Sequence, residues 1–256
     1  MQEFIQSIAR EAGELVKGFY KATKPVQKDN WVDLVTEADI QANTLLVERI
    51  RAAYPEHGII SEEKDEDVNI DAEFIWTVDP LDGTNNFSHG IPFFTTMISL
   101  LKNKEPILST VYDPIHNEMV VAEKGQGVTL NGRLITCSKN KKWEESMGIS
   151  SPRWKSSSSD IYENIKAESQ KYGLFWCCLL EGIGHQGIYV ASGRLDWVII
   201  SQGPKLWDFA PVTLILQESG CKVTTHSGQP WTYSDREMIA APPQLYDYVF
   251  GLVQKK

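Results

Sequence analysis

Asp79-Pro-Leu-Asp-Gly-Thr84 directly follows the apolar run Phe74-Ile-Trp-Thr-Val78, and this junction decides the fold that we predict. The apolar run has the length and the aromatic and β-branched content of a short buried strand. The two carboxylates after it are three positions apart, and they project into one cleft if the chain turns at Pro80 and Gly83, which favour turns. Carboxylates that close repel each other unless a cation lies between them. Oxygen ligands with no neighbouring His or Cys favour magnesium over zinc, so the stretch predicts a magnesium site at the end of a strand.

An ordinary solvated turn explains the same six residues about equally well, because Asp, Pro and Gly are all common turn formers. The residues that follow, Thr84-Asn-Asn-Phe87, suit the start of a short helix. The free N–H groups at such a start would hold a phosphate. The choice between a turn and a site therefore depends on acids elsewhere in the chain.

Three further acids are candidates, and each also has a plainer explanation. Asp208 starts a helix that reaches Gly220, and Pro211 fits only in the first turn, which places Asp208 at or near the N-cap. Glu62 opens an acidic run that is typical of a charged loop. Asp39 lies early in a helix, where an acid stabilises the helix dipole.

The whole chain predicts a mixed α/β protein, with sheets between layers of helices. The first half, about 1–140, combines helices with an antiparallel meander, and the second half, 141–256, alternates helices and strands, with the polar segment 139–160 as the join. A type I′ hairpin turn is expected at Asn131-Gly132. The predicted helices are 3–20, 36–53, 160–171, 183–192, 208–218 and a C-terminal helix, and the predicted strands are 32–35, 74–78, 95–101, 106–112, 119–123, two within 128–135, 174–180, 195–200, 221–224 and 237–240.

Length and composition exclude several classes of protein. A chain of 256 residues with 42% hydrophobic content can bury a sizeable core as one domain. The formal charge of -9 and the pI near 5.1 argue against a nucleic-acid or anionic-membrane partner. No apolar run approaches the length of a membrane span, and the first residues lack the pattern of a leader. We therefore expect a soluble cytoplasmic protein with no membrane and no nucleic-acid partner.

Four segments together resemble the signature segments of the inositol monophosphatase family. They are Asp33 to Asp39, Ile60 to Glu63, Trp76 to Phe87 and Trp207 to Gly220. They occur in the family's order, and the resemblance covers nearly the whole chain. One such segment alone is a weak signal, whereas four at fitting distances are highly specific.

The resemblance implies a fold, an activity and a set of site residues. The fold is the layered αβαβα sandwich of the inositol-monophosphatase and fructose-1,6-bisphosphatase type, and many relatives are homodimers. The activity is hydrolysis of a small phosphorylated metabolite by a phosphoric monoester hydrolase, in which two or three Mg²⁺ ions activate a water. The implied metal ligands are Glu62, Asp79, Asp82, Asp208 and the carbonyl of Leu81. Thr84, oriented by Asp39, positions the attacking water, and the implied substrate contacts are Gly83, Thr84, Asn85, Asp82, Ser201 and Asp208.

Two departures from the family pattern lie on the substrate side of the site. Sugar-alcohol phosphatases of the family usually carry a glutamate seven residues before the last metal ligand, where this chain has Ser201. The small-residue segment that opens the preceding helix is here Gly182-Ile-Gly-His-Gln-Gly187. Inositol phosphate, fructose 1,6-bisphosphate and 3′-phosphoadenosine nucleotides therefore all remain candidate substrates. His185 and Lys205 could contact a second anionic group, but we expect an exposed helix-surface His and a solvated Lys.

Two competing hypotheses belong to other classes. Gly182 to Gly187 matches the GxGxxG pattern of dinucleotide-binding folds, although no early βαβ unit accompanies it. Protection from unfolding by NAD and not by magnesium would favour that reading. A non-catalytic protein that binds a phosphorylated ligand is the second alternative, but it would not need Thr84 and Asp39.

Overall fold

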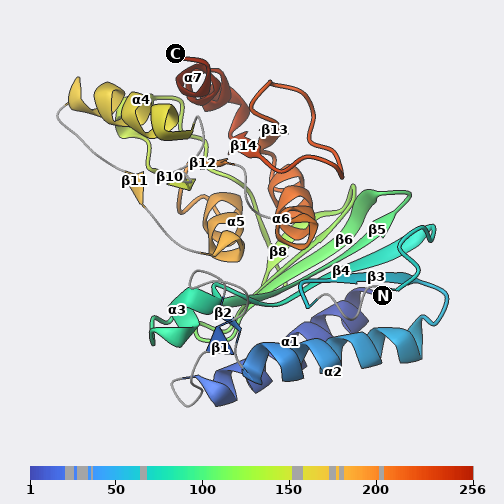
Figure 1. Cartoon of the computed structure of the whole chain (residues 1–256). Helices are drawn as coiled ribbons and strands as arrows, with labels where there is room; N and C mark the ends of the chain where they lie inside the picture. The colour runs from blue at the N-terminus through green and yellow to red at the C-terminus, as the bar shows by residue number, and fades with distance from the viewer. Residues whose placement is uncertain are drawn as a thin grey trace.

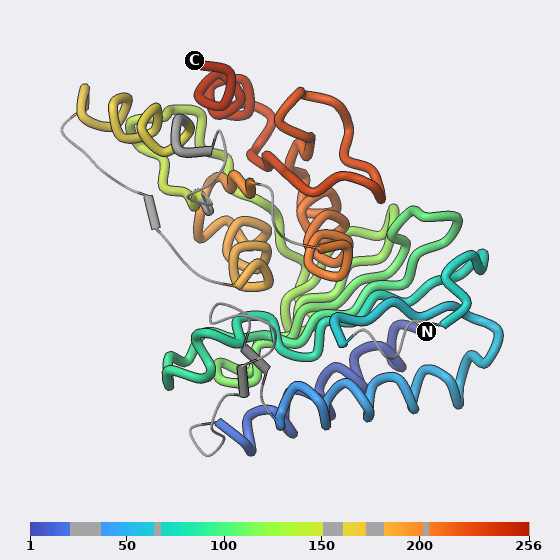
Figure 2. The backbone as a smooth tube through the Cα atoms, in the orientation of Figure 1, coloured from blue at the N-terminus to red at the C-terminus, as the bar shows by residue number. Residues whose placement is uncertain are grey.

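The computed structural model describes residues 1–20, 26–27, 34–35, 37–63, 68–151, 158–172, 177–178, 182–201 and 205–255. The chain forms five stacked layers in the order helix, sheet, helix, sheet, helix (Figure 1). This is the αβαβα sandwich that the resemblance implied. The backbone trace starts in the outermost helical layer on one side and ends in the outermost helical layer on the other (Figure 2).

The first two layers are a helix pair and a seven-stranded sheet. The helices α1 (Gln2–Phe19) and α2 (Glu37–Ala53) cover one face of the sheet. The sheet order is β3-β4-β5-β6-β7-β8-β9, and every pair is antiparallel except β3 and β4, which are parallel. The strands are β3 (Gly58–Ser61), β4 (Phe74–Asp82), β5 (Thr95–Lys102), β6 (Glu105–Asp113), β7 (Glu118–Glu123), β8 (Gly127–Leu130) and β9 (Arg133–Ile135). A short helix, α3 (Thr84–Ser88), follows β4, and a small separate sheet pairs β1 (Val26–Gln27) with β2 (Leu34–Val35).

The other three layers come from the second half of the chain. Helices α5 (Ile183–Ala191) and α6 (Leu206–Glu218) lie between the two sheets, and α4 (Ser158–Gln170) and α7 (Pro243–Gln254) form the outer layer. The five-stranded sheet has the order β11-β10-β12-β14-β13. Its strands are β10 (Gly148–Ser151), β11 (Cys177–Cys178), β12 (Trp197–Ile200), β13 (Lys222–Thr224) and β14 (Met238–Ala241), and a 3₁₀ turn at Trp143–Glu145 precedes them.

Alternating side chains divide the seven-stranded sheet between two cores. In β7, Val120 and Ala122 pack toward α5 and α6, whereas Met119 and Val121 pack toward α1 and α2. Successive side chains of a strand point to opposite faces, so one apolar strand serves both cores. This explains why these strands are apolar runs in the sequence. Among the described residues, no helix is both long and apolar enough to cross a membrane.

Most predicted elements are confirmed within three residues at each end. The hairpin turn is confirmed, since Asn131 and Gly132 have φ angles of 49° and 78°, as a type I′ turn requires. Strands β3 and β10 were not predicted, because four residues give too short a signal, and β10 lies within the segment 139–160 that was predicted to be a polar join. Of the predicted strands 32–35 and 174–180, the structure describes only Leu34–Val35 and Cys177–Cys178.

Helix α6 starts earlier than predicted. Its N-cap is Lys205, so Asp208 is the third helical residue and not the N-cap. The Asp208 carboxylate accepts the N–H of Lys205, as in a capping box. Pro211 therefore lies in the second turn, where it leaves the carbonyl of Trp207 without its intrahelical donor.

The other end of α6 is tied to the seven-stranded sheet. Both carboxylate oxygens of Glu218 accept backbone N–H groups of the β7–β8 turn, from Gly125 and Gly127, each at 2.8 Å. The helix between Asp208 and Glu218 is buried on almost every side. Its C-terminal end is thus fixed to the sheet by side-chain hydrogen bonds, whereas its N-terminal end is capped by its own Asp208.

Candidate active site

A β-bulge in β4 turns Asp79 and Asp82 to the same side of the sheet. Residues three apart in a regular strand point to opposite faces. Here Asp79 pairs with Met97 and Asp82 with Thr95, so three steps along β4 match two steps along β5. The extra residue changes the alternation and brings the two carboxylates together. The two carboxylates lie close together, as predicted, but the cause is a bulge inside a strand that runs to Asp82, not a turn after Val78.

Two more acids reach this pair from other elements. Carboxylate oxygens of Asp79, Asp82 and Asp208 all lie within 4.8 Å of one another. Glu62 follows β3, and its N–H donates to the carbonyl of Val78 at 3.1 Å, which continues the pairing with β4. Parallel strands end at the same edge of a sheet, and the Glu62 carboxylate accordingly contacts that of Asp79.

Burial makes this cluster unfavourable without positive charge. Asp79 and Asp82 are only 1% and 7% exposed. Desolvation, followed by the charges of Glu62, Asp82 and Asp208, raises the pKa of Asp79 well above its usual value. Burial also raises the pKa of Asp82, and burial together with Asp82 raises the pKa of Asp208 to about 7. Hard carboxylate oxygens that share a buried position fit a divalent cation such as Mg²⁺, so these residues could hold one.

We expect Mg²⁺ to raise the Tm more at about pH 8 than at about pH 5. Without metal, the pKa of Asp208 in the folded protein is about 7, against an ordinary value of 3.8, so the folded state binds more protons than the unfolded state between these limits. Its stability contribution is therefore present at the acidic end and is lost as the pH rises through about 7. A cation removes this loss, because it takes the place of the bound protons.

Calorimetric melting curves with EDTA or with saturating Mg²⁺ across this pH range measure the effect. The Asp79→Asn variant serves as the control, because its cluster carries one charge fewer and its Mg²⁺-induced gain should depend less on pH. A gain that is the same at every pH would contradict the proposed state of the cluster.

The Thr84 hydroxyl lies between two acceptors beside the cluster. Its Oγ1 is 3.3 Å from Oδ1 of Asp39 and 3.0 Å from the carbonyl oxygen of Leu81. Asp39 is 1% exposed and stands in the first turn of α2. The hydroxyl has one proton for both acceptors, and when it donates to Asp39 its lone pairs can accept a hydrogen bond from a water.

Helix α3 starts next to the carboxylates, as predicted. Gly83 is its N-cap with a φ of 90°, and a Cβ there would lie 2.8 Å from the carbonyl oxygen of Phe93. The position therefore requires glycine for its backbone conformation and for space. Thr84 and Asn85 are the first two residues of the helix, and their N–H groups precede the first intrahelical donor, Phe87, which bonds to the carbonyl of Gly83.

The glycine-rich segment at the start of α5 contacts Asp82, a contact that was not predicted. The N–H groups of Ile183 and Gly184 donate to Oδ1 and Oδ2 of Asp82 at 3.0 and 2.8 Å, and Thr95 donates to Oδ2 at 3.0 Å. A Cβ on Gly184 would overlap the Thr95 hydroxyl. A dinucleotide pyrophosphate would need these N–H groups, but they are already bonded to Asp82. The GxGxxG hypothesis is therefore wrong.

The residues on the predicted substrate side differ in how deeply they are buried. Ser201 follows β12, is 3% exposed, and its hydroxyl has no hydrogen-bond partner among the described residues. Lys205 is exposed, as expected. His185 is not on the surface: it is 0% exposed, so the prediction of an exposed His is wrong. Its partner is Asp113, which is far away in the sequence, and no local pattern marks such a contact.

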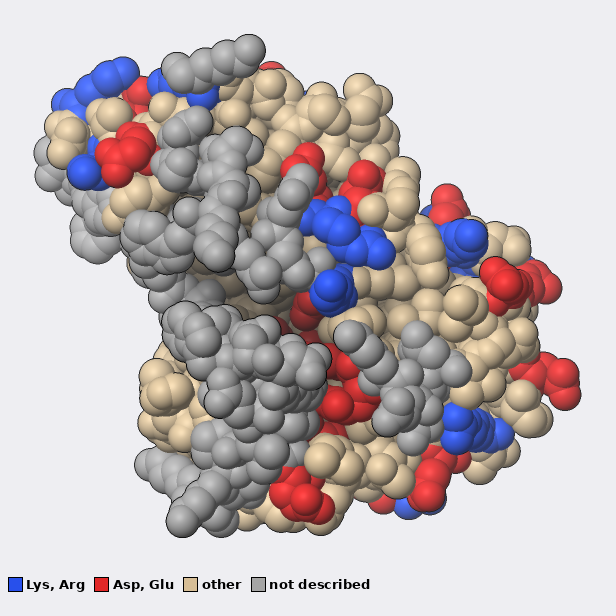
Figure 3. Space-filling model, in the orientation of Figure 1, with Lys and Arg blue, Asp and Glu red and all other residues tan. Residues whose placement is uncertain are grey.

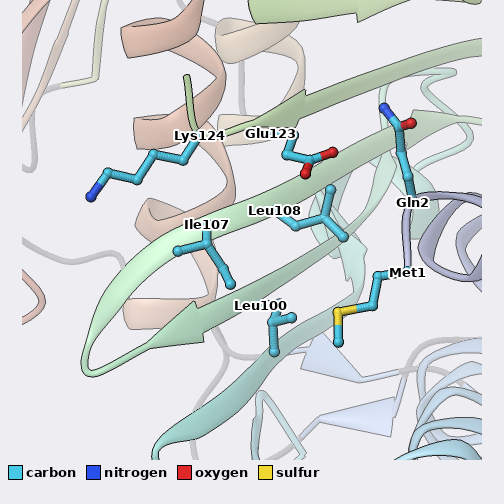
Figure 4. Close-up of a pocket in the computed structure, with 7 residues that line it drawn as sticks. All are labelled: Met1, Gln2, Leu100, Ile107, Leu108, Glu123 and Lys124. Carbon is cyan, nitrogen blue, oxygen red and sulfur yellow. The ribbon is translucent and has the colours of Figure 1, made fainter. Parts of the chain in front are cut away.

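Acidic side chains gather in a hollow between the two halves of the molecule, with Lys and Arg side chains beside them (Figure 3). A separate groove at the other end of the seven-stranded sheet has a volume of about 530 Å³ (Figure 4). It is lined by Met1, Gln2, Leu100, Ile107, Leu108, Glu123 and Lys124, none of which is a predicted site residue.

The layered α/β fold places buried carboxylates at the end of β4, beside the N-terminus of α3. This arrangement defines a class of α/β enzyme that could bind a cation there. Comparison with known proteins narrows this class: the model of the inositol monophosphatase family matches residues 1–256, so the chain belongs to that family of phosphoric monoester hydrolases. Inositol monophosphatase 2 of Solanum lycopersicum is 32% identical, over 96% of each chain. A fructose-1,6-bisphosphatase/inositol-1-monophosphatase of Thermotoga maritima is 28% identical, over 99% of this chain and 95% of that protein. The solved structure of the extragenic suppressor protein SuhB of Bartonella henselae superposes with a TM-score of 0.90 at 26% identity, over 99% of this chain and 98% of that one.

Proposed function

We propose that the protein is a Mg²⁺-dependent phosphomonoesterase that hydrolyses a small phosphorylated metabolite by attack of water on phosphorus. The observation that carries the proposal is the set of three carboxylates within 4.8 Å of one another, beside the Thr84 hydroxyl and its contact with Asp39. A structural role for so many buried like charges would be costly, because desolvation and repulsion both oppose it. A cation-binding role removes both costs.

Each residue of the site has a proposed part in the reaction. Two or three Mg²⁺ ions would be held by Glu62, Asp79, Asp82, Asp208 and the carbonyl of Leu81. When bound, such ions lower the pKa of water and neutralise charge on phosphate oxygens. Thr84, with its proton directed to Asp39, would accept a hydrogen bond from the attacking water and orient it.

The phosphate would lie against the start of α3. The N–H groups of Gly83, Thr84 and Asn85 are the proposed donors, and Asp82 and Asp208 would face the substrate from the metal side. Ser201 is the proposed contact on the side of the leaving group. A serine hydroxyl can donate or accept a single weak bond, whereas a carboxylate would hold two neighbouring hydroxyls of a sugar alcohol. The substrate is therefore proposed at the level of a phosphomonoester, with inositol phosphate and fructose 1,6-bisphosphate first, since relatives are named for both.

A phosphate-release screen with and without Mg²⁺ tests the proposal. The panel covers inositol phosphates, sugar bisphosphates and 3′-phosphoadenosine nucleotides, and EDTA should abolish release from whichever compound is a substrate. Asp82→Asn is the control that separates this activity from a contaminant. Tight binding of a phosphorylated compound without release would instead favour the non-catalytic alternative.

We also propose that the protein is a cytoplasmic homodimer that binds neither nucleic acid nor membranes. The dimer is proposed by analogy with the family. The exclusion of nucleic acid and membranes is proposed because a net charge of -9 would repel their phosphates. Light scattering after size-exclusion chromatography would measure the mass, and a monomer of 28.9 kDa would contradict the dimer.

A further inference from the structure

His185 and Asp113 form a buried pair next to the turn of α5 that bonds to Asp82. His185 is the third residue of α5, and its Nε2 donates to Oδ2 of Asp113 at 2.8 Å. The two side chains are 0% and 1% exposed. The pKa of Asp113 falls to about 2, because hydrogen bonds from His185 and His116 outweigh the opposing effect of burial, so Asp113 is an ionised acceptor.

Asp113 is a fixed support for this contact. It is the last residue of β6, and its Oδ1 accepts the N–H groups of Ile115 and His116 at 2.8 and 3.0 Å. The exposed His116 ring also donates to Oδ2, at 2.7 Å. The carboxylate is therefore held by the seven-stranded sheet, and it can hold the ring of His185 in turn.

His185 directly follows a part of the backbone that bonds to Asp82. Gly184 directly precedes His185, and its N–H donates to Asp82 at 2.8 Å. The first turn of α5 has no free space there, since a Cβ on Gly184 would lie 3.0 Å from Oδ2 of Asp82. A small displacement of this turn would thus change two of the hydrogen bonds that orient Asp82.

A second contact joins His185 to the loop between α3 and β5. Its ring packs edge-on against Phe93 with 5.1 Å between centroids. The carbonyl of Phe93 accepts the side-chain amide of Asn86 in α3 at 2.9 Å and lies against Gly83. His185 therefore links the first turn of α5, to which it belongs, with the loop between α3 and β5.

We propose that His185 and Asp113 are positioning residues that hold the start of α5 against Asp82 and so set the geometry with which Asp82 binds a divalent cation. The inference rests on the proposed function, in which Asp82 is a metal ligand. Partners of this kind orient a ligand without touching the metal, and their loss typically costs about 10- to 100-fold in metal affinity or activity.

Two amide substitutions at His185 provide a matched test. In His185→Gln the amide nitrogen reaches about as far as Nε2 and can still donate to Asp113, whereas in His185→Asn it is one methylene too short. We expect His185→Asn to raise both the Mg²⁺ concentration for half-maximal rate and the calorimetric dissociation constant for Mg²⁺ by about tenfold, with a smaller change in KM. His185→Gln should stay within about threefold of wild type, and so should His116→Ala, which removes the other His on Asp113 without touching α5.

The outcomes separate this inference from the proposed function. If His185→Asn lowers the Tm and leaves Mg²⁺ binding unchanged, or if Gln and Asn behave alike, His185 is only a core residue and the inference is wrong. If wild type releases no phosphate from any compound, the proposed function fails. The calorimetric comparison of the two variants still decides the role of His185 in that case.

Discussion

Asp79→Asn is expected to lower kcat by about 10³-fold while raising the Tm of the metal-free protein. The amide keeps the shape of the carboxylate but loses a charged ligand, and several kcal/mol of stabilisation of the phosphoryl group depend on such ligands. A loss of about 4 kcal/mol corresponds to about 10³ in rate. The stability gain has the opposite sign, because Asp79 is fully buried next to Glu62, Asp82 and Asp208, and a neutral side chain removes their repulsion.

Single-turnover or steady-state phosphate release and a melting curve in EDTA measure the two effects of Asp79→Asn. The matched control is Asp71→Asn, an exposed acid in the loop before β4, which should change neither quantity. Activity near that of wild type would remove Asp79 from the site. A lower Tm of the metal-free variant would show that the carboxylate is stabilised by groups other than a cation.

Thr84→Val is expected to lower kcat by about 10²- to 10⁴-fold, which is the usual contribution of a positioned proton acceptor or donor. Valine has the shape of threonine, so the start of α3 should persist while the hydroxyl that contacts Asp39 and Leu81 disappears. Thr84 is not a proposed metal ligand. The Mg²⁺ concentration for half-maximal rate and the KM should therefore change much less than kcat.

Thr84→Ser keeps the hydroxyl and should restore most of the rate. Thr44→Val is the surface control, because Thr44 is an exposed residue of α2 that bonds only to its own helix at Ile40. If Thr84→Val raised the Mg²⁺ requirement as strongly as it lowered kcat, Thr84 would act through metal binding and not through the water.

The elements and the acids of the site could be predicted because their signals are local. Apolar alternation and turn residues gave the meander and most helices, and four short segments gave Glu62, Asp79, Asp82 and Asp208. The bulge at Asp79 could not be predicted, because Pro80 favours a turn and a bulge equally well, and only the register against β5 distinguishes them.

Contacts between distant segments account for the errors in the glycine-rich segment and at His185. The glycines from Gly182 to Gly187 were visible as small residues, but the N–H groups of Ile183 and Gly184 donate to a carboxylate about a hundred residues away. The burial of His185 depends in the same way on Asp113, at a separation of 72 residues. The start of α6 was misplaced because the sequence rule for proline in a first turn was applied to Pro211, and the surrounding layers stabilise a helix that tolerates it.

The attachment of α6 at its C-terminus and the place of Asp208 in the carboxylate cluster make this helix a spacer of set length. Its N-terminal turn carries Asp208 and its C-terminal residue, Glu218, is anchored to the β7–β8 turn. One residue added between them would rotate Asp208 by roughly 100° about the helix axis and advance it by about 1.5 Å, which would point its carboxylate away from Asp79. Side chains along α6 can therefore vary in kind as long as they pack, whereas the number of residues from Asp208 to Glu218 cannot change without dismantling the site.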